Sequence, residues 1–171
     1  MREQAARLVE IASDAIARVG RLAQGMSVEV LQMLGLPAAL DRLGADLLTG
    51  MSFSASFGAA ASERLPAEIE VALFRIAQEA LTNVVRHARA MRVRIAVDRT
   101  PGRLEMLVQD DGCGFDAAAA HAAAARGETL GLVGMRERVE LIGGTIAVIS
   151  RPGNGCSVRV RVPMSDRKES R

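Results

Sequence analysis

The sequence is poor in aromatic residues, cysteine and histidine, and these shortages exclude several classes of function. It contains four Phe and neither Trp nor Tyr, so it lacks the stacking platforms that bind single-stranded nucleic acid. Its two cysteines, Cys113 and Cys156, form no Cys-x-x-Cys pair, and with only two histidines a structural zinc site has too few ligands. A reducing compartment is the default expectation for so few cysteines.

Strong charge of one sign and long apolar runs are also missing. The 22 basic and 20 acidic residues give a net charge of +2, which by itself indicates no nucleic-acid partner. No apolar run approaches the roughly 20 residues that cross a bilayer, and the N-terminus shows no signal-peptide pattern. We therefore expect a cytoplasmic chain without direct membrane contact. Its 171 residues suffice for one domain with a sizeable core.

The N-terminal third predicts helices. Residues 3–24 carry apolar side chains at a spacing of three and four, which makes one helical stripe that could pack on the domain or form a homodimer. The "LGLP" break at 34–37 precedes a second short helix with Leu40, Leu43 and Leu47 on one side. We expect residues 1–48 to form a helical segment and residues 165–171 a solvated tail.

Residues 49–164 predict an α+β domain. The alternating segment 51–58 is typical of a half-buried strand, and a long helix is expected from Pro66 to about Ala90. Further strands are expected at 92–98 and 103–110, then a helix at "GMRERVELIGG" and two closing strands, "TIAVIS" and "SVRVRVP". This order predicts a two-layer α/β sandwich, in which about three helices cover a mixed, mostly antiparallel sheet, with an N-terminal helical extension.

The long helix carries an unusual line of polar residues in "QEALTNVVRHA". Glu79, Asn83 and Arg86 or His87 are spaced four and then three or four apart, so their side chains share one face beside the buried stripe. A carboxylate can orient or deprotonate a nucleophile, and an amide oxygen can bind Mg²⁺. An ordinary solvated helix face is the alternative interpretation.

Two glycine-containing motifs follow. "DDGCG" places Asp110 at the end of an apolar strand, with Gly112 and Gly114 allowing close backbone approach; a plain hairpin turn would have the same pattern. A buried carboxylate there would accept from the exocyclic amine of adenine. "TLGLVGMRERV" places Gly131 and Gly134 before a helix, whose free N–H groups suit phosphate oxygens, although a simple loop and helix start is the alternative.

Taken in order, these motifs resemble the ATP-binding domain of two-component sensor histidine kinases, within the superfamily that includes DNA gyrase and MutL-type ATPases. "FRIAQEALTNVVRHA" resembles the asparagine box, "DDGCGF" the first glycine box and "GLVGMRERVELIGG" the second. The resemblance covers roughly residues 20–163 and is strongest to the subfamily paired with helix-turn-helix response regulators. It implies ATP and Mg²⁺ as ligands.

The resemblance also implies roles for individual residues. Asn83 would be the Mg²⁺ ligand, and Glu79 the acid that polarises the attacking group and reaches the metal through water. Asp110 would read adenine. The remaining ATP-binding positions implied by the family are Arg86, His87, Gly112, Gly114, Gly131, Leu132, Gly134 and Ser157, with residues 117–130 as a lid. Positioning and charge compensation are what phosphoryl transfer chiefly requires of a protein.

The chain departs from the family pattern at two motifs. Where relatives often have Thr after the last glycine, it has Cys156 followed by Ser157, so either Ser157 replaces that contact or the contact is missing. The second glycine box is also short of glycines, which predicts altered lid mobility.

A phosphoacceptor motif is missing from the sequence. Family kinases phosphorylate a histidine on a dimerisation helix, in a stretch resembling "RIARELHD" that this sequence lacks. The first histidine, His87, lies inside the nucleotide motif. We expect a fragment of a longer kinase rather than a short protein acting in trans, and a response regulator as the downstream partner.

Two other functions keep the same fold. An anti-sigma-factor-like serine kinase would have a similar pocket, and a nucleotide-binding module without catalysis would have a degenerate one. Co-purification with a sigma factor would favour the first, and loss of Mg²⁺-dependent binding the second.

Overall fold

A computed structural model describes residues 29–61, 63–120 and 130–164 of the chain. Residues 29–34 are helical, and after Gly35 the chain enters α2. From α2 onward the elements form two layers, one of helices and one of strands. In chain order they are α2 (Leu36–Leu47), β1 (Ser52–Phe57), the short η1 (Ala59–Ala61), α3 (Ala67–Asn83), the π-helical turn η2 (Val84–Ala88), β2 (Arg92–Thr100), β3 (Arg103–Asp110), α5 (Leu130–Leu141), β4 (Thr145–Ser150) and β5 (Cys156–Pro163).

The strands form one mixed sheet in the order β1-β2-β3-β5-β4. β1 runs parallel to β2, because α3 carries the chain back across the sheet between them, whereas all other neighbours are antiparallel. β3 therefore occupies the centre of the sheet. Its last residue, Asp110, is paired with Val93 on one side and Cys156 on the other.

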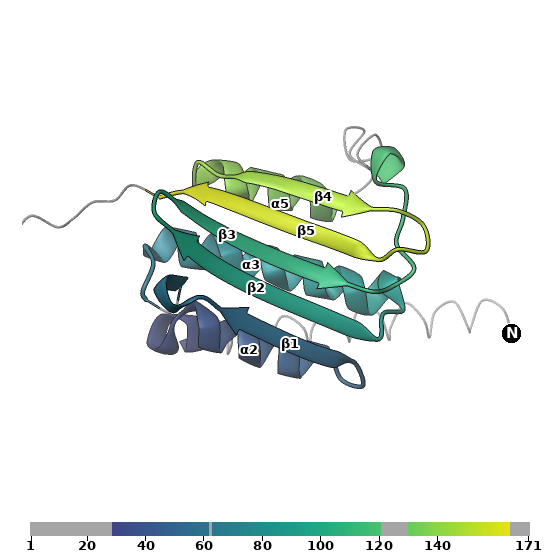
Figure 1. Cartoon of the computed structure of the whole chain (residues 1–171), viewed down its shortest axis with the longest axis horizontal. Coiled ribbons are helices and arrows are strands. Elements are labelled where there is room, and N and C mark those ends of the chain that lie inside the picture. Colours follow the sequence, from purple (N-terminus) through teal and green to yellow (C-terminus); the bar gives the residue numbers. More distant parts are fainter. Residues whose placement is uncertain (1–28, 62, 121–129, 165–171) are drawn as a thin grey trace, which may run out of the picture.

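The helices α2, α3 and α5 lie on one face of this sheet (Figure 1). α3 lies behind the central strands, flanked by α2 behind β1 and α5 behind β4 and β5. Strand alternation explains the arrangement: Ile95, Met106 and Val160 face the helices and are fully buried. The opposite face carries charged side chains, including Glu105, which pairs with Arg159 and Arg161.

One hydrophobic core extends from Leu31 to Val162. It includes Leu36, Leu40 and Leu43, so α2 packs on the same core as the sheet. The expected α/β sandwich with about three helices is confirmed. The helix expected at 3–24 and the tail 165–171 lie outside the described residues. No helix in the described part of the chain is long and apolar enough to span a membrane.

Candidate functional site

A cavity of about 530 Å³ opens between the helical layer and the carboxyl end of β3. The end of α3, the turn η2, the loop after β3, the start of α5 and strands β4 and β5 all contribute to its walls. This cavity brings together eight of the eleven residues predicted from the sequence: Glu79, Asn83, Arg86, His87, Asp110, Gly114, Gly131 and Leu132. Residues of all three sequence motifs therefore meet in one cavity.

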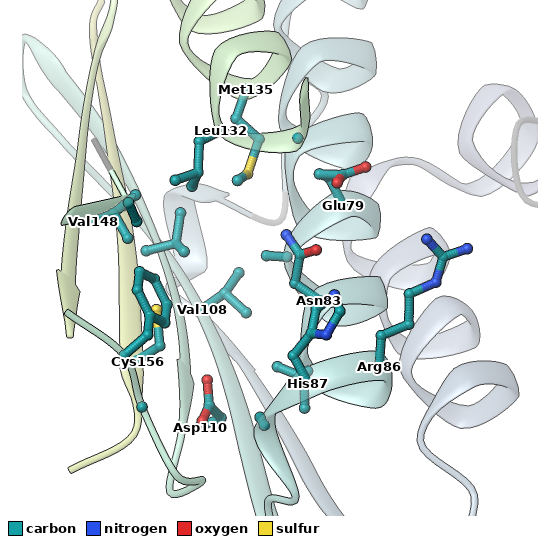
Figure 2. A pocket seen from close by; sticks show the side chains of 18 of the residues that line it. Glu79, Asn83, Arg86, His87, Val108, Asp110, Leu132, Met135, Val148 and Cys156 are labelled. Carbon is teal, nitrogen blue, oxygen red and sulfur yellow. The ribbon is translucent and has the colours of Figure 1, made fainter. Parts of the chain in front are cut away.

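The polar wall of the cavity comes from a single stretch of helix. Figure 2 shows Asn83 extending from α3 toward the sheet, with His87 one turn further on and Arg86 on the side away from the sheet. α3 passes directly into the π-helical η2, and Arg89 closes that turn in a left-handed conformation, with φ of 52°. π-helical turns within α-helices are frequent at functional sites, because they alter which side chains share a face.

Glu79 and Asn83 have no hydrogen-bond or ion-pair partner within residues 29–61, 63–120 and 130–164. Their environment is nevertheless specific. A side chain at Gly131 would collide with the Glu79 carboxylate, and the built Cβ would lie 3.7 Å from Nδ2 of Asn83. Both polar groups therefore lie beside the N-terminal turn of α5, where the helix dipole favours negative charge. Their side chains remain available to a ligand in the cavity.

Asp110 forms the polar group at the sheet end of the cavity. The residue is only 8% exposed, and its Oδ1 accepts a hydrogen bond from the Gly112 N–H at 2.9 Å. Burial raises the pKa of Asp110 above its ordinary value, and the backbone N–H groups of Gly112 and Cys156 partly offset this effect. A buried carboxylate with remaining acceptor capacity is suited to a ligand amine or amide donor.

Backbone contacts join the two walls of the cavity. The Cys113 N–H donates to the Ala88 carbonyl at 2.7 Å, and the Cys113 thiol donates to the His87 carbonyl at 3.3 Å. Gly112 packs so closely on Ala88 that any Cβ at position 112 would collide with it. Gly112 therefore does not line the cavity; its lack of a side chain permits the contact between η2 and the loop after β3.

A second set of contacts holds the rest of that loop. Ser150, at the end of β4, accepts from the Phe115 N–H at 2.9 Å and donates to the Gly155 carbonyl at 2.7 Å. Gly114 adopts φ of +60° and approaches the Arg151 and Gly155 carbonyls too closely for any side chain. Ser150 is buried and had no signal in the sequence, since only the pairing of β4 with β5 brings it to this loop.

The wall facing Asn83 is apolar. Val158 lines this wall beside its strand partner Val108. Val108, Val148, Leu132 and Met135 are seen on the same side of the cavity in Figure 2. Cys156 also faces the cavity, and burial together with the nearby Asp110 charge raises the pKa of its thiol to about 11. An apolar surface beside a buried acceptor fits a heterocycle with an exocyclic donor.

Ser157 does not line the cavity. It lies between Cys156 and Val158 on β5, and strand alternation turns its side chain toward the opposite face of the sheet. The threonine that relatives often have at this position is Cys156 here. The geometry indicates that the contact of that threonine is missing, because Ser157 does not reach the cavity to replace it. The thiol of Cys156 occupies the position on the cavity side.

The second glycine motif differs from its expected geometry. The sequence predicts that Gly131 and Gly134 precede a helix, but α5 already begins at Leu130 and includes both. Gly131 remains in the first turn, where backbone N–H groups have no intrahelical acceptor. Gly134 lies one turn further on, outside the cavity lining, where a Cβ would meet the Arg138 guanidinium at 3.0 Å. Of the expected lid, residues 121–129 lie outside the described residues.

Comparison with known proteins agrees with the motif order. Residues 68–166, more than half of the chain, match the family model of histidine kinase-, DNA gyrase B- and HSP90-like ATPases. The sensor histidine kinase MctS of Rhizobium johnstonii is 34% identical over 93% of this chain. The signal transduction histidine-protein kinase/phosphatase DegS of Bacillus subtilis is 36% identical over 63% of it. The chain spans 34% and 28% of the length of these two relatives.

Solved structures show the same fold. The histidine kinase domain of the blue-light activated histidine kinase from Erythrobacter litoralis superposes with a TM-score of 0.67 at 20% identity, covering 83% of this chain and 71% of that domain. A second structure of that kinase gives a TM-score of 0.65 at 24% identity, covering 85% of this chain and 49% of the other. The chain therefore belongs to the family of histidine kinase-, DNA gyrase B- and HSP90-like ATPases, and its curated relatives are sensor histidine kinases.

Proposed function

We propose that this chain binds Mg·ATP in the cavity and acts as the catalytic domain of a sensor histidine kinase. It would transfer the γ-phosphate to a histidine on a dimerisation helix, for relay to a response regulator. One observation carries the proposal: a wall of polar groups without partners in the described residues, Glu79 and Asn83, faces the same cavity as the buried Asp110. The curated relatives named as histidine kinases support this choice of reaction.

The sheet end of the cavity is proposed to hold adenine. Asp110 would accept from the exocyclic amine, while the surface of Val108, Val148 and Met135 would cover a face of the ring. Guanine presents a carbonyl oxygen where adenine presents the amine, so an ionised carboxylate would repel it. Gly112 and Gly114 contribute by shaping the loop, because neither position tolerates a side chain.

The helix end of the cavity is proposed to hold the phosphates. The Asn83 amide oxygen fits a hard cation, and Mg²⁺ usually takes one or two protein ligands together with substrate phosphates. Glu79 would act through a metal-bound water or polarise the attacking imidazole. Arg86 and His87 lie at the outer part of the same wall. The metal, when bound, would offset phosphate charge during transfer.

The start of α5 is proposed to supply backbone donors to the phosphates. Gly131 and Leu132 line the cavity within the first turn of the helix, where N–H groups lack intrahelical acceptors. Gly134 would act indirectly, through the packing of that turn. Ser157 is left out of the proposed contacts because its strand neighbours line the cavity instead.

We also propose a parent protein and partners for this chain. Since the chain spans about a third or less of its curated relatives, the phosphoacceptor histidine would lie in sequence beyond this chain. The proposed downstream partner is a cytoplasmic response regulator with a helix-turn-helix output domain. Residues 3–24 are proposed to mediate homodimerisation. We propose that residues 1–48 form the helical segment and residues 49–164 the ATP-binding domain.

The proposal is tested by calorimetric titration of the chain with ATP, with and without Mg²⁺, followed by incubation with γ-labelled ATP. We expect Mg²⁺-dependent binding and no acid-labile phosphate on the chain itself. Transfer should appear only when a phosphoacceptor helix from a related kinase is added. Absence of Mg²⁺-dependent binding would refute a catalytic pocket, and label on His87 or His121 would refute the assignment of an external acceptor.

A further inference from the structure

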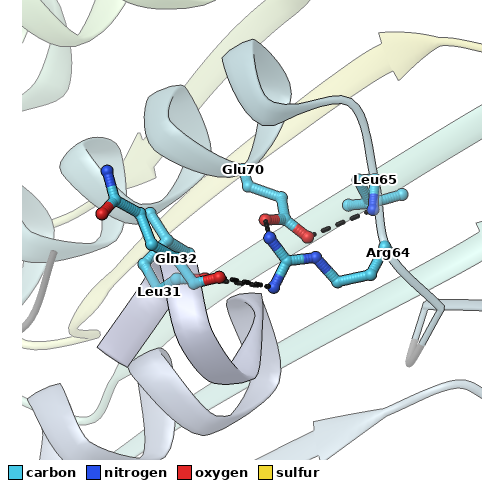
Figure 3. A network of polar contacts seen from close by, with 5 residues as sticks. All are labelled: Leu31, Gln32, Arg64, Leu65 and Glu70. Atoms are coloured by element: carbon cyan, nitrogen blue, oxygen red, sulfur yellow. Dashed lines mark hydrogen bonds and ion pairs between the residues drawn. The ribbon is translucent and has the colours of Figure 1, made fainter. Parts of the chain in front are cut away.

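A single guanidinium joins two segments that are more than thirty residues apart in the sequence (Figure 3). Nη1 of Arg64 donates to the carbonyl oxygens of Leu31 and Gln32, both at 3.3 Å. Nη2 of the same side chain lies 3.1 Å from Oε2 of Glu70. Arg64 therefore connects the helix that ends at residue 34 with the start of α3.

Glu70 fixes the position of that guanidinium. Its side chain is only 3% exposed, although it lies in the first turns of α3, and its Oε1 accepts from the Leu65 N–H at 3.1 Å. The carboxylate is thus held from two directions and cannot follow Arg64 into solvent. The forked guanidinium can contact the carboxylate and the two carbonyls together, which a lysine ammonium cannot do from one point.

The contacted carbonyls belong to the last turn of the helix at residues 29–34. The Leu31 carbonyl also accepts from the Gly35 N–H at 3.0 Å, so Arg64 is its second donor. The carbonyl groups of a last turn carry the negative end of the helix dipole, so a guanidinium there is favourable. Gly35, with φ of +85°, turns the chain directly after this helix, and Leu31 is buried in the core. The last turn is therefore held by packing on one side and by Arg64 on the other.

We propose that Arg64 is a positioning residue that fixes the direction of the helix at residues 29–34 relative to α3. This inference rests on the proposed function, in which a phosphoacceptor must approach the cavity at the other end of α3. Glu70 and Glu79 are nine residues apart on that helix, about 14 Å at 1.5 Å per residue. Glu70, Glu79 and Asn83 all lie on α3. A helix at residues 29–34 whose direction is fixed at Glu70 is therefore also fixed relative to the cavity end of α3.

Hydrogen exchange measured by mass spectrometry tests this assignment. The main variant combines Arg64→Met with Glu70→Gln, so that no buried charge is left unpaired and the introduced amide oxygen can still accept from the Leu65 N–H. We expect amides of residues 31–36 to exchange about tenfold faster, and those of β3 to remain unchanged. Arg64→Lys should give an intermediate rate. Mg·ATP affinity should stay within about twofold of the unaltered chain, since the cavity is remote.

Arg99→Met is the matched control. It removes a 3.6 Å ion pair to Glu63, next to Arg64 in the same loop, without touching the helix at residues 29–34. Unchanged exchange at residues 31–36 in the double variant would overturn the inference. An equal increase of exchange in β3 would also overturn it, because Arg64 would then stabilise the whole domain and not this helix in particular. If the unaltered chain fails to bind Mg·ATP, the proposed function fails while the exchange result still decides whether Arg64 holds the helix.

Discussion

The two ends of α3 carry glutamates with opposite surroundings. Glu70, near the start, is buried and satisfied by the Leu65 N–H and the Arg64 guanidinium. Glu79, near the end, lines an open cavity and has no partner within the described residues. Asn83, one turn beyond Glu79, has the same character. One regular helix therefore presents a structural carboxylate and a polar pair that faces the cavity.

This difference separates stabilising from functional polar groups by a physical criterion. A buried polar group normally finds its hydrogen bonds within the protein, because leaving it unsatisfied is costly. A polar group that lines a cavity without a protein partner keeps its capacity for a ligand. On this criterion Glu70 belongs to the scaffold, and Glu79 and Asn83 belong to the candidate site.

The largest expected effect comes from a substitution at the end of α3 that faces the cavity. Asn83→Ala removes the proposed metal ligand, and we expect Mg·ATP affinity to fall about 100-fold, or about 2.7 kcal/mol. Calorimetric titration measures this change. Gln78→Ala is the control, because Gln78 lies on the same helix outside the cavity and pairs with Arg75. Equal affinities for the Asn83 variant and the unaltered chain would contradict the proposed metal site.

A substitution of Glu70 at the start of α3 should change the free energy of unfolding and not the affinity for Mg·ATP. Glu70→Ala leaves the Leu65 N–H without its acceptor and removes the Arg64 partner, so we expect a loss of about 2 kcal/mol in the free energy of unfolding. Glu79→Ala should change it by less than about 0.5 kcal/mol. Urea unfolding gives both values. Equal destabilisation of the Glu70 and Glu79 variants would contradict the assignment of a structural role to Glu70 alone.

Asp110→Asn sharpens the comparison at the sheet end of the cavity. The amide can donate to the guanine carbonyl, so we expect ATP affinity to fall about tenfold, or about 1.4 kcal/mol, and GTP affinity to rise. Competition of each nucleotide against a fluorescent ATP analogue measures the ratio. Asp98→Asn, exposed on the opposite face of the sheet, should leave it unchanged. An unaltered ratio in the Asp110 variant would refute adenine recognition by this residue.

The smallest expected effect concerns pH. Burial raises the pKa of Asp110, so its carboxylate becomes protonated at a higher pH than an ordinary aspartate as the pH falls. Since the ionised form is the proposed acceptor, ATP affinity should fall a few-fold on acidification through this raised pKa. The raised pKa also makes folding stability depend on pH. The free energy of unfolding should fall as the pH rises from the pKa of Asp110 in the unfolded chain to its higher pKa in the folded chain, and the full loss is present above the folded pKa. Asp110→Asn should flatten both profiles; retained profiles would assign them to another group.

Much of the fold followed from sequence periodicity. The alternation in β1 to β3 and the three-and-four spacing in α3 predicted those elements, because each buries one face against a single core. The beginning of α5 was less predictable. Gly131 and Gly134 are weak helix formers, yet α5 includes both, and Gly131 packs closely on Glu79 of α3.

The site was predictable only where residue chemistry identified it. Asn83 and Asp110 stood out as polar residues beside apolar stripes, and the structure brings both to one cavity. Ser150 and Cys113 act through contacts between segments far apart in sequence, which no local pattern encodes. The side of β5 that faces the cavity also depends on pairing register, which decided between Cys156 and Ser157.

The cavity contains two thiols in different surroundings. Cys113 is exposed, whereas Cys156 is half-buried with a pKa of about 11 and so has very little thiolate at neutral pH. Because the thiolate is the reactive form, an alkylating reagent should modify Cys113 selectively. The protein thus contains its own chemical reporter of occupancy: protection of Cys113 by a nucleotide can be followed by mass without any engineered label.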